Sequence, residues 1–238
     1  MEIQAFLNQI KGGLIVSCYS HHDYNTPFST REPMLALTES IEEGGASAIR
    51  VNLKHISYLK ERLHIPIYGI EKIYHGDQMR ITPTLKEVEA LVTAGADAIA
   101  IDATKRERFD DLPLESYIHT VKRNFDIPLL GDISTFVEGV NAALYGLDAV
   151  STTLSGYTPN SPAFGKLGDI PPAEPDFQLI RDLKAAISIP VIAEGRFGTP
   201  KQAQDALMAG AHAVVVGTAI SNPQKITELF VHFMGSSS

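Results

Sequence analysis

The chain has 238 residues, close to the roughly 250 typical of a one-domain α/β barrel. Its apolar content of 44% is ample for one large core and too high for a disordered protein. The formal net charge of −8 argues against a broad nucleic-acid surface, which would be basic. It does not argue against a phosphate ligand, which a few backbone N–H groups and one arginine can hold.

The single cysteine, Cys18, rules out an intrachain disulfide and favours a reducing compartment. Residues 1–13 contain scattered polar side chains and lack the continuous apolar core of a signal peptide. No run approaches the roughly 18 apolar residues of a membrane helix. We therefore expect a cytoplasmic protein with no membrane partner.

Eight short apolar runs follow one another along the chain and are interpreted as strands. They cover residues 14–18, 44–50, 65–69, 94–100, 127–131, 146–150, 189–193 and 209–215. Three of them open with an Ile-Pro dipeptide, and their prolines (Pro66, Pro128 and Pro190) are separated by two equal intervals of 62 residues. Proline is tolerated at the first residue of a strand. Four of the other runs follow a small-residue turn, where glycine can end a helix before a strand begins.

Helical periodicity lies between these runs. Residues 85–94 place Leu85, Val88 and Leu91 on one face, and residues 200–209 follow Thr199 as a candidate N-cap. Apolar strands separated by helices indicate a parallel sheet covered on its faces. Eight such units with a 62-residue double period predict a single (β/α)₈ TIM barrel of the phosphate-binding type spanning residues 1–238. The alternative is a doubly wound sheet, but no G-x-G-x-x-G motif follows the first run.

Polar or small residues follow each apolar run at the same relative place. They are Cys18, Arg50, Lys72, Asp102, Asp132, Thr153, Glu194 and Gly217. In a barrel these strand ends meet at one face, where the active site lies. We therefore expect several of them to line one site, although Asp102 taken alone could equally cap the helix that follows it.

Lys72 and Glu194 end the third and seventh predicted strands, which lie opposite each other in a ring of eight. Two-base epimerisation needs such a pair, because one group removes a proton from a carbon and the other returns one to the opposite face. Lys72 must then have a lowered pKa, which burial and nearby Arg50 would provide. The alternatives are a Lys–Glu ion pair across the barrel mouth and a Schiff-base lysine at position 72.

The last two strand ends have the composition of a phosphate site. Gly195 and Arg196 precede one helix start, and Gly217 and Thr218 precede a short helical segment. The loops after strands seven and eight are the usual phosphate site of this fold, and glycine lets backbone N–H groups approach a ligand closely. The alternative is a pair of ordinary strand-to-helix turns.

The same residues belong to a wider pattern, and from about residue 13 to residue 230 the chain resembles the bacterial N-acetylmannosamine-6-phosphate 2-epimerases. The matching stretches are residues 13–18, 44–46, 49–50, 81–88, 102–106, 131–135, 151–158 and 192–196. The resemblance implies metal-independent proton transfer at C2 of an amino-sugar phosphate, without a cofactor, in sialic-acid and aminosugar catabolism. It implies Lys72 and Glu194 as the catalytic pair.

The resemblance also suggests which residues bind the ligand. The expected substrate-binding residues are Arg50, Asp132, Thr153, Ser155, Tyr157 and Tyr19, and the expected phosphate-binding residues are Gly195, Arg196, Gly217 and Thr218. The ligand is expected to be a small phosphosugar, with neither nucleic acid nor metal. The sequence leaves the oligomeric state open, a homodimer included.

The chain departs from the family pattern around the sugar. Tyr19 stands where the family has glutamine, Ile73 stands where it has a basic residue, and residues 51–53 are less polar than usual. The alternative functions are therefore an epimerase or isomerase of a related phosphosugar, a Schiff-base lyase, and a phosphosugar-binding protein without activity.

Two further segments have residues that could serve a function. His21, His22 and Asp23 could ligate a metal, but no further ligand follows at suitable spacing, and a solvated loop is the favoured reading. Residues 157–175 are rich in proline and glycine and read equally well as a mobile lid or as an irregular insertion.

Overall fold

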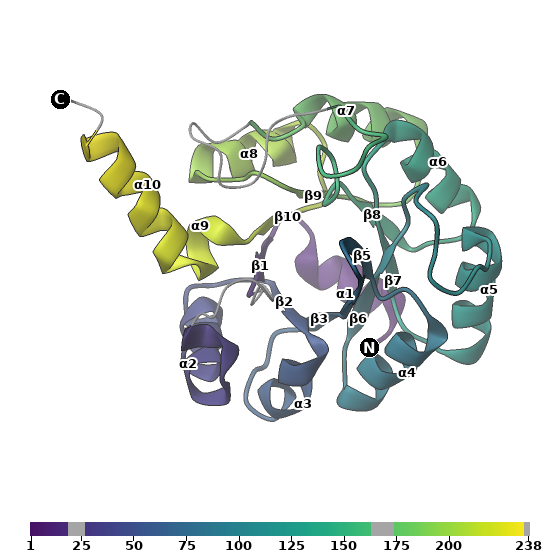
Figure 1. Ribbon diagram of the computed structural model, residues 1–238, viewed down its shortest axis with the longest axis horizontal. Coiled ribbons are helices and arrows are strands. Elements are labelled where there is room, and N and C mark those ends of the chain that lie inside the picture. The colour runs from purple at the N-terminus through teal and green to yellow at the C-terminus, as the bar shows by residue number, and fades with distance from the viewer. Residues whose placement is uncertain (19–26, 163–173, 236–238) are drawn as a thin grey trace.

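The computed structural model describes residues 1–18, 27–162 and 174–235. Eight parallel strands close into a barrel in the order β1-β10-β9-β8-β7-β6-β3-β2 (Figure 1). These strands are β1 (Leu14–Ser17), β2 (Ala48–Asn52), β3 (Ile67–Ile70), β6 (Ala98–Asp102), β7 (Leu129–Asp132), β8 (Ala149–Ser151), β9 (Val191–Glu194) and β10 (Ala213–Val216). The predicted (β/α)₈ barrel is confirmed, and the doubly wound alternative is wrong because the sheet has no open edge.

Helices surround the barrel (Figure 1). They are α2 (Arg31–Glu43), α3 (Leu53–Lys60), α4 (Leu85–Ala94), α5 (Leu114–Asn124), α6 (Phe136–Leu144), α7 (Phe177–Ala186) and α8 (Pro200–Met208), with a 3₁₀ turn at Pro27–Ser29. The expected helix at 85–94 is confirmed, and the one at 200–209 ends one residue earlier. Thr199 caps α8 by accepting a hydrogen bond from the backbone N–H of Gln202, whose side chain accepts in return.

The evenly spaced prolines stand immediately before β3, β7 and β9. Each has its carbonyl in the sheet: Pro66, Pro128 and Pro190 accept hydrogen bonds from Ile49, Ile99 and Val150 at 3.1, 2.9 and 3.0 Å. A proline lacks an N–H but keeps its carbonyl acceptor, so it can start a strand without weakening the neighbouring strand.

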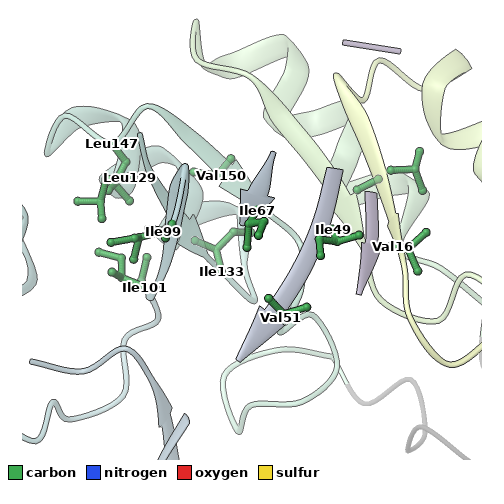
Figure 2. Close-up of a cluster of buried hydrophobic side chains, with 14 of the residues drawn as sticks. Val16, Ile49, Val51, Ile67, Ile99, Ile101, Leu129, Ile133, Leu147 and Val150 are labelled. Carbon is green, nitrogen blue, oxygen red and sulfur yellow. The ribbon is translucent and has the colours of Figure 1, made fainter. Parts of the chain in front are cut away.

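The core has two layers separated by the sheet. Outward side chains such as Ile49, Ile67 and Ile99 pack under the helices (Figure 2). Inward side chains are smaller, and Ala48, Ala98, Ala100, Ala149 and Ala213 are all fully buried. The N-terminal helix α1 (Ile3–Ile10) inserts Phe6, Leu7 and Ile10 into this inner cluster and closes the end of the barrel opposite the site.

One correction concerns Lys72. It does not end the third barrel strand, because β3 stops at Ile70 and Lys72 opens an antiparallel hairpin of β4 (Lys72–His75) and β5 (Gln78–Ile81). The two-residue turn has Gly76 at φ 59°, the sign that a type II′ turn requires at its first central position. Lys72 is therefore held by a hairpin that the sequence interpretation missed.

The C-terminal part departs from the regular pattern. After β10 come the short α9 (Thr218–Ser221) and then α10 (Pro223–Gly235), which extends away from the ring of helices (Figure 1). Four large apolar side chains of α10 are more than half exposed: Phe230, Val231, Phe233 and Met234. Most of the loop 157–175 and the whole His21–His22–Asp23 sequence lie outside the described residues.

Candidate active site

Side chains from three separated strands meet at the carboxyl-terminal end of the barrel. Arg50 of β2 forms ion pairs with Asp132 of β7, at 2.5 Å between Nη2 and Oδ2, and with Glu194 of β9. Arg50 is 2% exposed and Asp132 is fully buried, whereas Glu194 retains 14% exposure. Buried charges need this kind of pairing, and the closed barrel provides it by bringing β2, β7 and β9 around one space.

Thr153 joins these charges from the end of β8. Its hydroxyl lies 2.6 Å from Asp132 Oδ1, 3.0 Å from Glu194 Oε2 and 3.3 Å from Arg50 Nη1. A hydroxyl has one proton and two acceptor lone pairs, so Thr153 donates to one carboxylate at a time and accepts from Arg50. We call Arg50, Lys72, Asp132, Thr153 and Glu194 the ionic cluster.

Lys72 belongs to this cluster electrostatically. Burial lowers the pKa of Lys72 to about 8, and the charge of Arg50 lowers it further, while Glu194 and Asp132 act in the opposite direction. All three charges therefore reach Lys72, as expected for groups facing one another across a ring. A lysine with a pKa of about 8 can exchange a proton near neutral pH, which an ordinary surface lysine cannot.

Asp132 is perturbed in a different way. Burial raises the pKa of Asp132 to about 6 and nearby Glu194 raises it as well, while Arg50 and the Thr153 hydroxyl lower it. Burial lowers the pKa of Arg50, but the two carboxylates outweigh this and leave it raised. Arg50 therefore stays charged and keeps both carboxylates in place.

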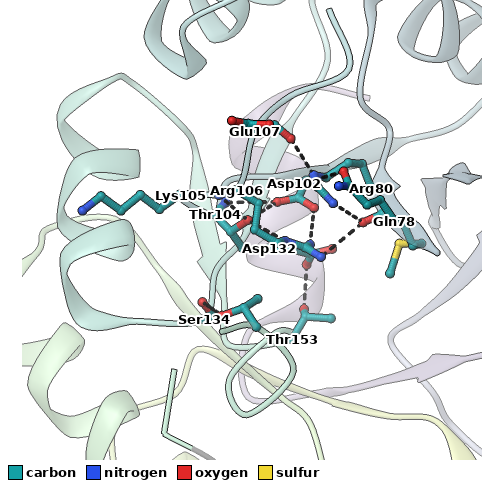
Figure 3. A network of polar contacts seen from close by, with 12 residues as sticks. Gln78, Arg80, Asp102, Thr104, Lys105, Arg106, Glu107, Asp132, Ser134 and Thr153 are labelled. Atoms are coloured by element: carbon teal, nitrogen blue, oxygen red, sulfur yellow. Dashed lines mark hydrogen bonds and ion pairs between the residues drawn. The ribbon is translucent and has the colours of Figure 1, made fainter. Parts of the chain in front are cut away.

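Asp102 does not join the ionic cluster and does not cap a helix. It accepts hydrogen bonds from Thr104 and forms an ion pair with Arg106 at 2.5 Å (Figure 3). Arg106 also donates to the Met79 carbonyl at 3.2 Å, and Arg80 donates to the Glu107 carbonyl at 2.7 Å. Asp102 therefore holds Arg106 in place, and Arg106 and Arg80 link the hairpin that contains Lys72 with the loop after β6. The sequence pattern that could have predicted this ion pair is an arginine, Arg106, four residues after the strand-end aspartate.

The four expected phosphate residues lie at the ends of two adjacent strands. Glu194 of β9 pairs with Val215 of β10, so Gly195 and Gly217 reach the same edge of the barrel. Gly195 has φ 107° and Gly217 immediately precedes α9, which starts at Thr218. We call Gly195, Arg196, Gly217 and Thr218 the glycine turns.

Within the glycine turns, Arg196 is 7% exposed and donates to two backbone carbonyls. Its Nε lies 2.8 Å from the Glu174 oxygen and its Nη1 bonds the Ser155 oxygen, while its guanidinium lies 5.7 Å from the centre of the Tyr157 ring. These contacts hold together the two described ends of the loop after β8.

The other expected substrate residues are placed less directly. The Ser155 hydroxyl donates to Asp176 at 2.8 Å, and Asp176 caps α7, so Ser155 makes a structural contact. Tyr157 packs against the inner cluster. Tyr19 lies outside the described residues.

Within the ranges 1–18, 27–162 and 174–235, no three histidine, cysteine or acidic side chains are grouped as a metal site would require. Among the described helices, none is both long and apolar enough to span a bilayer. Cys18 is buried, and burial raises the pKa of its thiol to about 12.

Comparison with known proteins identifies the family. Residues 34–236 match the family described as "Putative N-acetylmannosamine-6-phosphate epimerase". Proteins named "Putative N-acetylmannosamine-6-phosphate 2-epimerase" from Caldanaerobacter subterraneus and Cutibacterium acnes are each 41% identical. The matches cover 96% and 92% of this chain, and 93% and 92% of those proteins.

Solved structures agree. The N-acetylmannosamine-6-phosphate 2-epimerase from Clostridium perfringens superposes with a TM-score of 0.86 at 38% identity, covering 95% of each chain. A thiamine phosphate pyrophosphorylase from Pyrococcus furiosus, at 15% identity and a TM-score of 0.59, shares the fold alone. The chain belongs to the N-acetylmannosamine-6-phosphate 2-epimerase family.

Proposed function

We propose that this protein is an isomerase that interconverts N-acetylmannosamine 6-phosphate and N-acetylglucosamine 6-phosphate by inverting C2. The observation that carries the proposal is the electrostatic coupling of Lys72 to Glu194 and Arg50 from different strands of one barrel. Family membership supports the substrate, because the relatives at about 40% identity carry the name of this reaction.

The proton transfers balance with these residues. One of Lys72 and Glu194 removes the C2 proton of the open-chain sugar, and the C–H electrons move onto the neighbouring carbonyl oxygen as an enolate. The other group then gives a proton to the opposite face of C2, and the electrons return to carbon. The positive charge of Arg50 stabilises the developing oxyanion, and Asp132 positions a sugar hydroxyl.

The phosphate end of the substrate is assigned to the glycine turns. Gly195 adopts a positive φ, and Gly217 leads directly into α9 at Thr218, so the backbone at both turns lacks a side chain that would keep an anion away. Arg196 adds a positive charge beside them.

The direct test is incubation with N-acetylmannosamine 6-phosphate in D₂O, followed by NMR at C2. We expect the C2 proton to be replaced by deuterium as N-acetylglucosamine 6-phosphate appears. A folded protein that gives neither exchange nor epimer would contradict the proposed substrate. Borohydride treatment in the presence of substrate should leave no mass adduct on Lys72, and an adduct would favour the Schiff-base lyase.

A homodimer is the second part of the proposal. It is supported by α10, which projects from the ring of helices (Figure 1). Its side chains Phe230, Val231, Phe233 and Met234 are each more than half exposed. Soluble monomers rarely expose such a contiguous apolar patch. Covering this helix against a second copy would remove these side chains from water.

Sedimentation of the purified protein tests the assembly. We expect a dimer for the natural chain and a monomer for Phe230→Glu combined with Phe233→Glu, because two buried charges would disrupt the apolar contact. The matched control is Leu144→Glu on α6, which is as exposed as Met234 but lies elsewhere, and it should remain dimeric. A natural chain that sediments as a monomer would contradict the proposal.

We also propose a cytoplasmic location. The support is the lone cysteine, Cys18, whose buried thiol needs no oxidising compartment. Fractionation of cells that express the protein should recover it with cytoplasmic markers, and recovery from the medium would contradict the proposal.

A further inference from the structure

Tyr68 is a fully buried tyrosine in the interior of the barrel, and the proton transfers above make no use of it. It lies on β3 and belongs to the inner cluster, whose strand residues include five alanines. Its phenol oxygen is buried and accepts or donates no hydrogen bond within the described part of the chain. A polar side chain so placed, where small apolar residues prevail, calls for a physical reason.

The ring of Tyr68 lies against the central residue of the ionic cluster. Arg50 and Tyr68 are directly paired across β2 and β3, and the guanidinium carbon of Arg50 is 5.1 Å from the ring centre. A cation over an aromatic face is attracted by the ring, more strongly when both are shielded from water. Arg50 thus has the two carboxylates and Thr153 on one side and an aromatic ring on the other.

The charges of the ionic cluster also act on Tyr68. Burial raises the pKa of Tyr68 well above its ordinary value, and the charges of Asp132 and Glu194 raise it further while Arg50 lowers it. The phenol is therefore neutral at physiological pH and supplies no charge of its own. Its contribution is the shape and the face of its ring.

We propose that Tyr68 is a positioning residue whose ring supports the Arg50 guanidinium at the height where it bridges Asp132 and Glu194. On β2 itself the inner-cluster residue two positions before Arg50 is Ala48, which is too small to fill the space that the Tyr68 ring occupies. With the ring removed, the guanidinium can drop into the vacated space and its contacts to the two carboxylates lengthen. The effect on turnover rests on the proposed function, whereas the effect on the position of Arg50 does not.

The test compares Tyr68→Leu with Tyr68→Phe and with Phe6→Leu. Phe6 packs against Tyr68, with ring centres 6.2 Å apart, in the same inner cluster, so Phe6→Leu matches the loss of core volume away from the cluster. We expect kcat for epimerisation to fall about 10–100-fold in Tyr68→Leu with little change in KM, because a displacement of about 1 Å can cost about 100-fold. Tyr68→Phe keeps the ring and should stay within about threefold of the natural chain, as should Phe6→Leu.

A pH profile separates positioning from general loss of stability. Arg50 lowers the pKa of Asp132, so weakening that contact should move the acid limb of kcat/KM to higher pH in Tyr68→Leu but not in Phe6→Leu. Tyr68→Met has about the same volume but a more flexible side chain that adapts to the vacated space, and it replaces Tyr68→Leu if the latter does not fold. An unmoved acid limb with kcat within threefold would overturn the proposal, and so would an equal loss in Tyr68→Phe.

Crystal structures of the natural chain and Tyr68→Leu give a readout that does not depend on turnover. We expect Arg50 to move toward the space left by the ring, and an unmoved guanidinium would overturn the proposal. If the natural chain fails to epimerise its substrate while Arg50 moves as expected, the proposed function fails and the role of Tyr68 stands.

Discussion

The ionic cluster and the glycine turns lie at the same end of the barrel, but the first is formed by side chains and the second mainly by backbone. The ionic cluster consists of charged side chains from β2, β7 and β9 together with Thr153 and the hairpin residue Lys72. Arg50 and Asp132 are buried, and Arg50 is paired with both Asp132 and Glu194. The glycine turns consist of backbone at the ends of two adjacent strands, with one arginine that bonds backbone carbonyls.

This difference matches the two proposed roles: proton transfer for the ionic cluster and phosphate binding for the glycine turns. Proton transfer needs groups with matched pKa values held at fixed distances, so it depends on side chains such as Lys72, whose pKa burial lowers. Holding a phosphate needs N–H groups at close approach, which backbone provides without titratable groups. Changes in the ionic cluster should therefore act on kcat, and changes in the glycine turns should act on KM and stability.

The largest expected effect comes from removing either proton-transfer group. Glu194→Gln and Lys72→Met should each lower kcat by about 100- to 10,000-fold, the range typical of general acid–base catalysis. The epimerisation assay by NMR measures the loss, and circular dichroism checks that each variant is folded. KM should change far less than kcat, since neither residue is assigned to the phosphate.

The matched control for Lys72→Met is Lys60→Met. Lys60 pairs with Asp97 at 2.5 Å, away from the ionic cluster, and is 42% exposed. Its loss removes a lysine and an ion pair without touching the site, so activity should be unchanged. Full activity in either Glu194→Gln or Lys72→Met would show that the ionic cluster does not carry the chemistry.

The features of the site that could be predicted from the sequence are those that depend on short local patterns of residues. The prolines at 66, 128 and 190 mark strand starts because a strand tolerates proline there, and this gave the order of strands and hence the opposition of β3 and β9. The strand-end rule then identified Arg50, Asp132, Thr153 and Glu194, which the structure brings into contact.

What the sequence could not predict depends on three-dimensional packing. The hairpin after β3 escaped because its strands are short and only Gly76-Asp77 signals the turn. Arg196 was assigned by its place in a glycine-rich turn, whereas the direction of its guanidinium toward the carbonyls of Ser155 and Glu174 follows from the loop around it. Tyr68 looked like an ordinary core residue, because only the register of β2 and β3 sets it beside Arg50.

The pH dependence of the ionic cluster is the next expected effect. The pair of Lys72 and Glu194 must hold one transferable proton, and with the pKa of Lys72 at about 8 that proton is lost above this pH. We therefore expect kcat/KM to fall about tenfold per pH unit above about pH 8, since only the singly protonated pair is active. Below about pH 6 Asp132 takes up a proton and weakens its hold on Arg50, so activity should fall there as well.

The two reaction directions provide the control for this profile. The ratio of kcat/KM in the two directions equals the equilibrium constant between the sugars, which does not depend on pH when both carry the same phosphate. Both directions should therefore show the same limb above pH 8. A profile that stays flat to pH 10 in the folded protein would contradict the role of Lys72.

The smallest expected effect comes from a substitution in the glycine turns, and it tests whether these turns serve binding and not proton transfer. Gly195 has φ 107°, which side chains with a Cβ rarely adopt, yet a Cβ there would meet only the carbonyl oxygens of Thr152 and Thr153 at 3.7 Å. Gly195→Ala should therefore cost about 1–3 kcal/mol through backbone strain alone, lowering Tm by roughly 3–10 °C.

The strained backbone also displaces the N–H groups assigned to the phosphate, so KM should rise about three- to tenfold while kcat is nearly kept. Gly198→Ala is the matched control, because Gly198 has no positive φ and its Cβ would meet only the Gln202 side chain at 3.8 Å. It should change neither Tm nor KM appreciably. A Gly195→Ala protein that lost kcat but kept its KM would place Gly195 in the chemistry, because strain confined to a phosphate-binding turn weakens ground-state and transition-state binding alike.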